Sequence, residues 1–246
     1  MWEYFTDPVY AVYAISLCLF ILVFLLGVIA QIRVQTVFAK YNGISSSSGI
    51  SAETYVRNFL ESSGVYGIRF AAVRGSLTDN FDPRSKTISL SDTVRGSSAI
   101  GAIGVACHEA GHAVQHDKKY FFSSARLKLV PIVNFASRLM WPIFIIGYIF
   151  GFASPYTAVG RIFIYAGLVV MGLSMLFSFV TLPTEFDASR RAQKELRENF
   201  FSSEEAALSR KVLTAAAMTY VVSFLMSLIQ FLRFVALLLM ARNRDN

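Results

Sequence analysis

Apolar residues are concentrated in four long stretches of the sequence. These stretches are Pro8–Ala30, Val130–Gly151, Arg161–Leu182 and Leu213–Met240. A helix of about 20 mainly apolar residues crosses the roughly 30 Å hydrocarbon layer of a bilayer. The pattern therefore predicts an integral membrane protein that is mainly α-helical and has about four transmembrane helices.

The apolar stretches divide the chain into five predicted parts. They are an N-terminal transmembrane anchor at 1–30, a polar part at 31–128, a transmembrane hairpin at 129–182, a polar helix at 183–212, and a C-terminal transmembrane helix with its tail at 213–246. A hairpin returns the chain to the side from which it started. We therefore expect the two polar parts to meet at one membrane surface.

The first polar part is predicted to be a small α+β, zincin-like unit. Ser51 is a suitable cap for a short helix that Gly64 ends. The apolar residues at helical spacing in it are Ala52, Tyr55, Val56, Phe59 and Leu60. Two short strands are expected at 67–73 and 86–91, with a turn at 79–83 between them. The free edge of the second strand is expected to hold an extended substrate by backbone pairing.

A metal-binding motif follows the second strand. His108-Glu109-Ala110-Gly111-His112 is an HExxH sequence, and all three histidines of the chain fall between His108 and His116. Residues four apart lie on one face of a helix, so the two imidazoles of the motif can converge on one zinc ion. Glu109 can then reach a water on that ion and act as its general base.

A zinc hydrolase site needs a third protein ligand and an open position. His116 lies eight residues after His108, about 12 Å along a helix, so it is expected to be an outer-shell or surface residue. Glu185 is the candidate ligand, because small residues follow it on one side of the predicted helix. Asp187 points about 200° away around that helix. From spacing alone, an ordinary interfacial acid is an equally good interpretation of Glu185.

Three further polar residues are candidates for the site. Asp79 and Asp82 can ligate metals, although paired aspartates in a turn rich in Asn and Pro more often stabilise the turn itself. Tyr220 can donate to the oxyanion of a tetrahedral intermediate, although packing is the commoner role of such a tyrosine.

Composition agrees with the membrane prediction. The 246 residues are 54% hydrophobic, and the mean hydropathy is +0.50, above the values of soluble domains. The net charge of +7 and pI of about 9.5 fit basic flanks of membrane spans better than nucleic-acid binding, for which the sequence has no motif. The only cysteines, Cys18 and Cys107, argue against a structural disulfide.

Charges around the first span predict its orientation. Glu3 and Asp7 precede the span, whereas Arg33 and Lys40 follow it. Basic residues favour the cytoplasmic side, so the N-terminus is expected outside. No basic region precedes the apolar stretch, which favours an uncleaved anchor over a signal peptide.

The larger charge count supports the same orientation. Residues 31–128 contain twelve Lys or Arg, and residues 183–211 contain six. Four spans would place the basic C-terminal tail outside, but these larger numbers of basic residues favour the cytoplasmic side for both polar parts. We therefore expect a multi-pass plasma-membrane protein of bacteria with its active site on the cytoplasmic face.

Three separated pieces of the sequence carry a family resemblance. Leu77–Pro83, His108–His112 and Thr181–Arg191, in this order and with these spans, resemble the YugP-type neutral zinc metallopeptidases of bacterial membranes. The likeness runs from Gln31 to Tyr220. More distantly the chain is similar to the HtpX/Ste24 membrane peptidases, whose HExxH is completed by a later glutamate. The resemblance implies a zinc peptidase with Glu185 as the third ligand.

Two positions depart from these family patterns. Ser189 stands where the Ste24-like pattern has an acid, so the support of a zinc histidine is expected to differ. Asn80 stands at a position of His in the YugP-like motif, which places any role of the turn at 79–83 in doubt.

The sequence thus predicts an endopeptidase that hydrolyses peptide bonds with zinc-activated water. His108, His112 and Glu185 hold Zn²⁺, Glu109 is the general base, and the partners are the lipid bilayer and protein or peptide substrates, with membrane proteins among the candidates. The alternatives are a non-catalytic zinc-stabilised scaffold and a site-2-type intramembrane protease. A transporter would need more polar residues inside its spans.

Overall fold

The computed structural model describes residues 8–149 and 158–243 of the chain. These residues form two compact units, each built from several segments. The helical unit comprises the described parts of Met1–Val28, Ala125–Val180 and Val221–Asn246, and the mixed unit comprises Ile29–Ser124 and Thr181–Tyr220.

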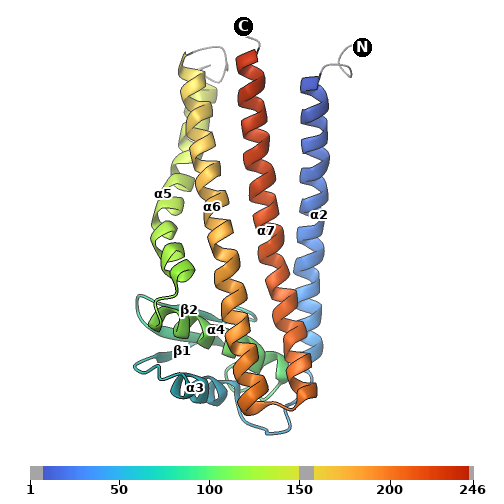
Figure 1. Ribbon diagram of the computed structural model, residues 1–246, viewed down its shortest axis with the longest axis vertical. Helices are drawn as coiled ribbons and strands as arrows, with labels where there is room; N and C mark the ends of the chain where they lie inside the picture. Colours follow the sequence, from blue (N-terminus) through green and yellow to red (C-terminus); the bar gives the residue numbers. More distant parts are fainter. Residues whose placement is uncertain (1–7, 150–157, 244–246) are drawn as a thin grey trace. The chain divides into compact units, whose positions relative to one another are not determined.

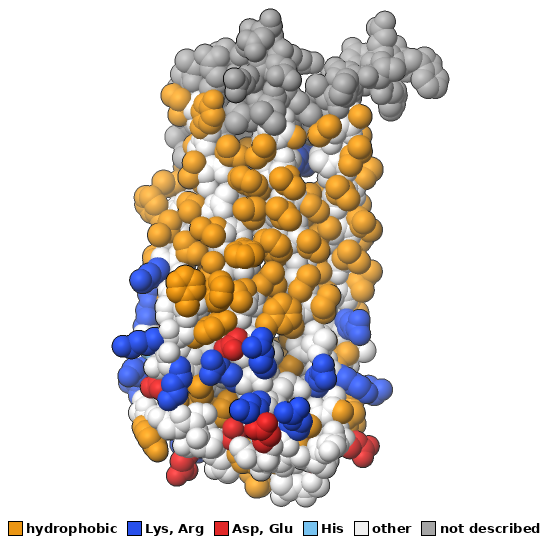
Figure 2. Space-filling view, viewed as in Figure 1, with side chains coloured by type: hydrophobic (Ala, Val, Ile, Leu, Met, Phe, Trp, Pro, Cys, Tyr) orange, Lys and Arg blue, Asp and Glu red, His pale blue; other side chains and the backbone are white. Residues whose placement is uncertain are grey.

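Four long helices supply the helical unit. They are α2 (Pro8–Asn42), α5 (Phe121–Ile149), α6 (Ala158–Glu195) and α7 (Ser203–Asn243). Large apolar side chains on the helical unit point outward, and hydrophobic side chains cover its face in Figure 2. Ile162 is 65% exposed and Val169 is 61% exposed, which suits a lipid environment and not water.

Three stretches of these helices are long and apolar enough to cross a membrane. They are Ala14–Asn42, Tyr165–Phe200 and Ser203–Ala236. The predicted span at 130–151 is not among them. It lies mostly in α5, and its last residues fall outside the described part of the chain, as do the ends of the predicted anchor and tail. The fourth span therefore stays a prediction.

Helix α6 continues through Pro183 and does not end there. Proline lacks the backbone N–H that would bond to the preceding turn, which costs about 3 kcal/mol in a helix interior. Thr181, Thr184 and Glu185, all within two residues of Pro183, are buried. Packing around the proline therefore offsets the lost hydrogen bond.

The mixed unit contains a small sheet and two further helices. The helices are α3 (Ala52–Ser62) and α4 (Ile100–Asp117), and the strands are β1 (Arg69–Val73), β2 (Asn80–Asp82) and β3 (Thr87–Ser91). A π-helical turn, η1 (Leu196–Phe200), follows α6. Helix α4 packs against α3 and against strands β2 and β3 (Figure 1).

Helix α3 forms as the sequence predicts. The Ser51 hydroxyl accepts a hydrogen bond from the Thr54 N–H, which satisfies one of the free donors of the first turn. The buried residues of α3 are Ala52, Tyr55, Val56, Phe59 and Leu60. Gly64 has a φ of +68°, a conformation that glycine adopts without steric cost, and the helix ends just before it.

The sheet differs from the prediction in two ways. The segment predicted as a turn contains strand β2, whose Phe81 pairs with Ile88 and packs on the core. The strand order is β1-β3-β2, with β1 parallel and β2 antiparallel to β3. Strand β3 is therefore central and has no free edge, so the expectation that it pairs with a substrate is wrong. The available edge nearest α4 belongs to β2.

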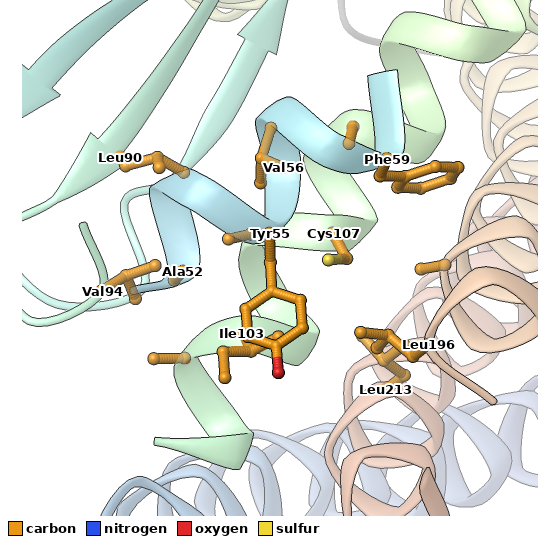
Figure 3. Close-up of a cluster of buried hydrophobic side chains, with 14 of the residues drawn as sticks. Ala52, Tyr55, Val56, Phe59, Leu90, Val94, Ile103, Cys107, Leu196 and Leu213 are labelled. Carbon is orange, nitrogen blue, oxygen red and sulfur yellow. The ribbon is translucent and has the colours of Figure 1, made fainter. Parts of the chain in front are cut away.

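The core of the mixed unit surrounds α4. Figure 3 shows side chains of α3 and β3 meeting Ile103 and Cys107 of α4, with Leu196 and Leu213 closing the cluster from η1 and α7. All these side chains are at most 4% exposed. Burial of one Leu or Ile side chain stabilises the fold by about 1.5–3 kcal/mol, so this cluster fixes α4 firmly in place.

Candidate metal centre

The two histidines of the motif lie side by side on α4. The ring centroids of His108 and His112 are 4.7 Å apart, as expected for residues one turn apart on a helix. The Nε2 atoms of both rings approach one carboxylate oxygen, Oε2 of Glu185, at 3.2 Å and 3.5 Å. Glu185 comes from α6, so two helices meet at this point.

The spacing of these three groups suits a metal ion. One ligand atom of each residue lies within 4.8 Å of the other two. Two zinc bonds of about 2.1 Å at a tetrahedral angle place their ligand atoms about 3.4 Å apart, close to the observed separations. Two imidazoles and one carboxylate also match the ligand set of catalytic zinc, which leaves a fourth position open. The residues therefore fit the ion that the sequence predicts.

Each imidazole also has a hydrogen-bond partner at its second ring nitrogen, Nδ1. The Nδ1 atom of His108 lies 3.1 Å from the Ser189 hydroxyl, and Nδ1 of His112 lies 3.0 Å from Oε1 of Gln115. Hydrogen bonds at Nδ1 fix the ring orientation and leave Nε2 for a metal. The partner of His108 is thus the Ser189 hydroxyl, where the Ste24-like pattern has a carboxylate.

Gln115 is a site residue that the sequence analysis missed. It is 0% exposed, and its amide nitrogen donates to the Thr184 carbonyl at 2.7 Å and to Asp187 Oδ2 at 2.9 Å. Because both donor hydrogens are committed, Oε1 must accept from His112, which therefore carries its proton on Nδ1. The signal was available, since Gln115 lies three residues after His112 on the same helical face.

Asp187 is turned away from the centre. Its carboxylate accepts from Arg191 Nε at 2.6 Å as well as from Gln115, and it is not part of the three-residue group. The direction predicted from helix geometry is therefore correct, and of the two acids it is Glu185 that faces the histidines.

Glu109 lies beside the group in a buried position. It is 9% exposed and lines a cavity of about 220 Å³ together with His108, Asp79 and Tyr220. Burial raises the pKa of the Glu109 carboxyl above its ordinary value, and the neighbouring histidines offset only part of this rise. A carboxylate with a raised pKa is a better proton acceptor at neutral pH.

The two aspartates near β2 have structural partners. Asp79 accepts from the backbone N–H and the hydroxyl of Ser91, at 2.7 Å and 3.0 Å. Asp82 accepts from the Arg84 N–H and the Ser85 hydroxyl, the turn chemistry expected for it. Neither belongs to the three-residue group, although Asp79 lines the cavity.

The remaining candidates lie around the centre. The ring of His116 contacts that of Phe81, with centroids 5.9 Å apart, and stands outside the group. The Asn80 amide donates to the Thr78 carbonyl. Cys107 is fully buried, and burial raises the pKa of its thiol, so it is an inert core residue.

Gly111, within the motif, lets α4 and α6 approach closely. A Cβ atom at this position would lie 2.6 Å from the Ala188 carbonyl oxygen, which belongs to the backbone and cannot rotate away. Gly104, on the same helix, has a different neighbour. A Cβ there would meet the Ser209 hydroxyl, which can rotate.

Gly111→Ala is therefore expected to separate the two helices and to destabilise the fold by about 1–3 kcal/mol. Zinc affinity should fall with it, because Glu185 moves with α6. Gly104→Ala is the matched control and should be nearly neutral, since alanine favours a helix by about 1 kcal/mol. Thermal unfolding and competition with a chelating dye measure both effects. Equal stability and equal zinc affinity of the two variants would contradict this account of Gly111.

The chain is similar to proteins described as metallopeptidases and membrane proteases. Residues 16–239 match a family described as "putative neutral zinc metallopeptidase". The chain is 37% identical over 217 residues to the "putative membrane protease YugP" of Bacillus subtilis (strain 168), and the match covers 88% of this chain and 93% of that protein. No solved structure matches the chain at a significant level.

Proposed function

Because the chain belongs to this family of neutral zinc metallopeptidases, we propose that it is a membrane-embedded zinc endopeptidase. One observation carries the proposal. The Nε2 atoms of His108 and His112 converge on the Glu185 carboxylate, with both Nδ1 atoms engaged, beside a cavity that contains Glu109. An oriented ligand set next to an acid in a cavity is the arrangement that metal-assisted hydrolysis requires.

Each residue of the site has a separate role in the proposed hydrolysis. His108, His112 and Glu185 hold the ion, which when bound supplies a Lewis acid and lowers the pKa of water. Glu109 accepts a proton from the attacking water and then donates it to the leaving amine. The Tyr220 hydroxyl, on the wall of the same cavity, is a candidate donor to the carbonyl oxygen.

The substrate in this proposal is an extended protein or peptide segment. The edge of β2 is a place where such a segment can pair by backbone hydrogen bonds, which would make binding tolerant of sequence. Leu77 and Asp79, just before β2, line the cavity beside His108. This assignment moves substrate pairing from β3 to β2.

The cellular setting follows from charge and from the family. The basic residues of the polar segments favour the cytoplasmic side of a bacterial plasma membrane. The Bacillus subtilis relative is named a putative membrane protease. Membrane proteins with exposed segments on that side are within reach of such an enzyme.

The test is metal content and proteolysis of the detergent-purified protein. We expect about one zinc per chain and slow degradation of casein, both removed by a chelator and restored by added zinc. Zinc without proteolysis of casein or of any membrane-protein substrate would favour the non-catalytic scaffold. Proteolysis that persists without metal would contradict the proposal.

A further inference from the structure

A second hollow of the mixed unit lies apart from the cavity beside Glu109. It is a groove of about 720 Å³ between the end of α6 and the beginning of α7. Its wall shares Leu213 with the smaller cavity but none of the three metal-binding residues. Ser189, which holds the His108 ring, also lines the groove, and the hydrolysis proposed above involves no other residue named here except through that contact.

Four basic side chains lie at one end of the groove. They are Arg190, Lys194, Arg197 and Arg210, and none of the described residues that line the groove is Asp or Glu. The basic residues of α6 and η1 are only weakly neutralised. Arg190 and Lys194 are each 4.0 Å from an acid, and Arg197 is 3.2 Å from Glu198. Their side chains are 69–78% exposed, where such pairs contribute little.

Arg210 differs from the other three. It is exposed, and within the described residues it has no ion pair. Gln193, on the facing helix, has a buried amide nitrogen without a hydrogen-bond partner. This donor would be satisfied by an oxygen ligand in the groove. Both groups can therefore donate hydrogen bonds to an anionic group bound at this end.

The other end of the groove is apolar. It is lined by Phe186, Leu213, Ala217 and Met218, and the Phe186 and Met218 side chains are each 42% exposed. From Phe186 in α6 to Arg197 in η1 is about 16 Å along the helix axis. From the apolar end both helices continue along the chain into their apolar stretches. The groove therefore changes from apolar to strongly basic along the axis of the two helices.

We propose that this groove binds an anionic phospholipid, with its phosphate among the arginines and an acyl chain against Phe186 and Met218. A soluble anion would leave the apolar end empty, and a zwitterionic lipid would carry its own cation into the basic end. An anionic lipid complements both ends. The inference does not rest on peptide hydrolysis, because its readout is lipid binding.

The test uses the full-length protein in detergent, titrated with phosphatidylglycerol or phosphatidylcholine and followed by native mass spectrometry. We expect tight binding of phosphatidylglycerol alone. Arg190→Gln with Arg210→Gln should weaken it by about 10-fold or more. Thr214→Trp should weaken it as well, since it fills the groove and leaves the charges unchanged. Equal binding by wild type and both groove variants would overturn the proposal.

Matched controls keep the test interpretable. Arg84→Gln with Lys86→Gln removes the same charge from exposed positions outside the groove and should change binding less than about 2-fold. Size-exclusion profiles and zinc content show whether each variant is folded. If the double arginine variant does not fold, Arg210→Gln alone takes its place. Displacement of the lipid by inorganic phosphate at equal concentration would overturn the lipid assignment. So would an acidic peptide that binds the groove more tightly than the lipid does.

Discussion

Glu109→Gln is expected to lower peptide hydrolysis by about 10²–10⁴-fold and to leave zinc content unchanged. Glutamine has the shape of glutamate but cannot accept a proton from water. Glu109 lies next to the three-residue group and is not part of it, so the ion keeps its ligands. The change should not unfold the protein either, because a neutral amide is easier to bury than an ionised carboxylate.

Metal analysis and casein degradation on the same samples measure this result. Glu61→Gln, an exposed carboxylate on α3, is the control and should leave both quantities unchanged. Loss of zinc together with activity would mean that Glu109 has a structural role. Full activity of Glu109→Gln would remove it from the mechanism and leave another acid, such as Asp79 in the same cavity, as the base.

Glu185→Ala should lower zinc affinity by more than about 100-fold. Loss of a partner outside the ligand shell typically costs about 10–100-fold, and Glu185 is itself one of the three groups. Its removal also takes away the negative charge to which both imidazoles point. Hydrolysis should disappear at ordinary zinc concentrations and return in part at high zinc.

The control for this variant is Glu198→Ala, an exposed acid of η1. It should bind zinc like the wild type. Unchanged zinc in Glu185→Ala would transfer the third-ligand role to another acid. Asp187 would have to leave Gln115 and Arg191 to take it, and Asp79 would have to leave Ser91. A double variant with either aspartate would then identify the ligand.

The proximity of the two motif histidines was predictable because it follows from helix periodicity, whereas spacing alone left the role of Glu185 undecided. His108 and His112 are one turn apart, and Glu185 is followed by Ala188 and Ala192 on the face that approaches α4. The same periodicity predicted α3 and its buried face. These features depend on residues close together in the sequence, where spacing and geometry are tightly linked.

Features that depend on distant partners were not predictable. Strand β2 has three residues, and only Phe81 among them is apolar, so its pairing with β3 leaves little trace in the sequence. The path of α6 through Pro183 depends on burial of the flanking residues. The position of Gln115 on the His112 face of the helix was visible in the sequence, but its anchoring by Thr184 and Asp187, about 70 residues later in the chain, was not.

One segment of α6 brings together everything that completes the histidine pair. Glu185 faces both imidazoles, Ser189 holds His108, and the Thr184 carbonyl anchors Gln115. Glu185 follows His108 by 77 residues, and the predicted hairpin at 129–182 separates them. Because a ribosome makes the chain from its N-terminus, HExxH emerges long before its third partner exists. A nascent chain thus carries an incomplete set of candidate ligands until the segment around Glu185 has been made.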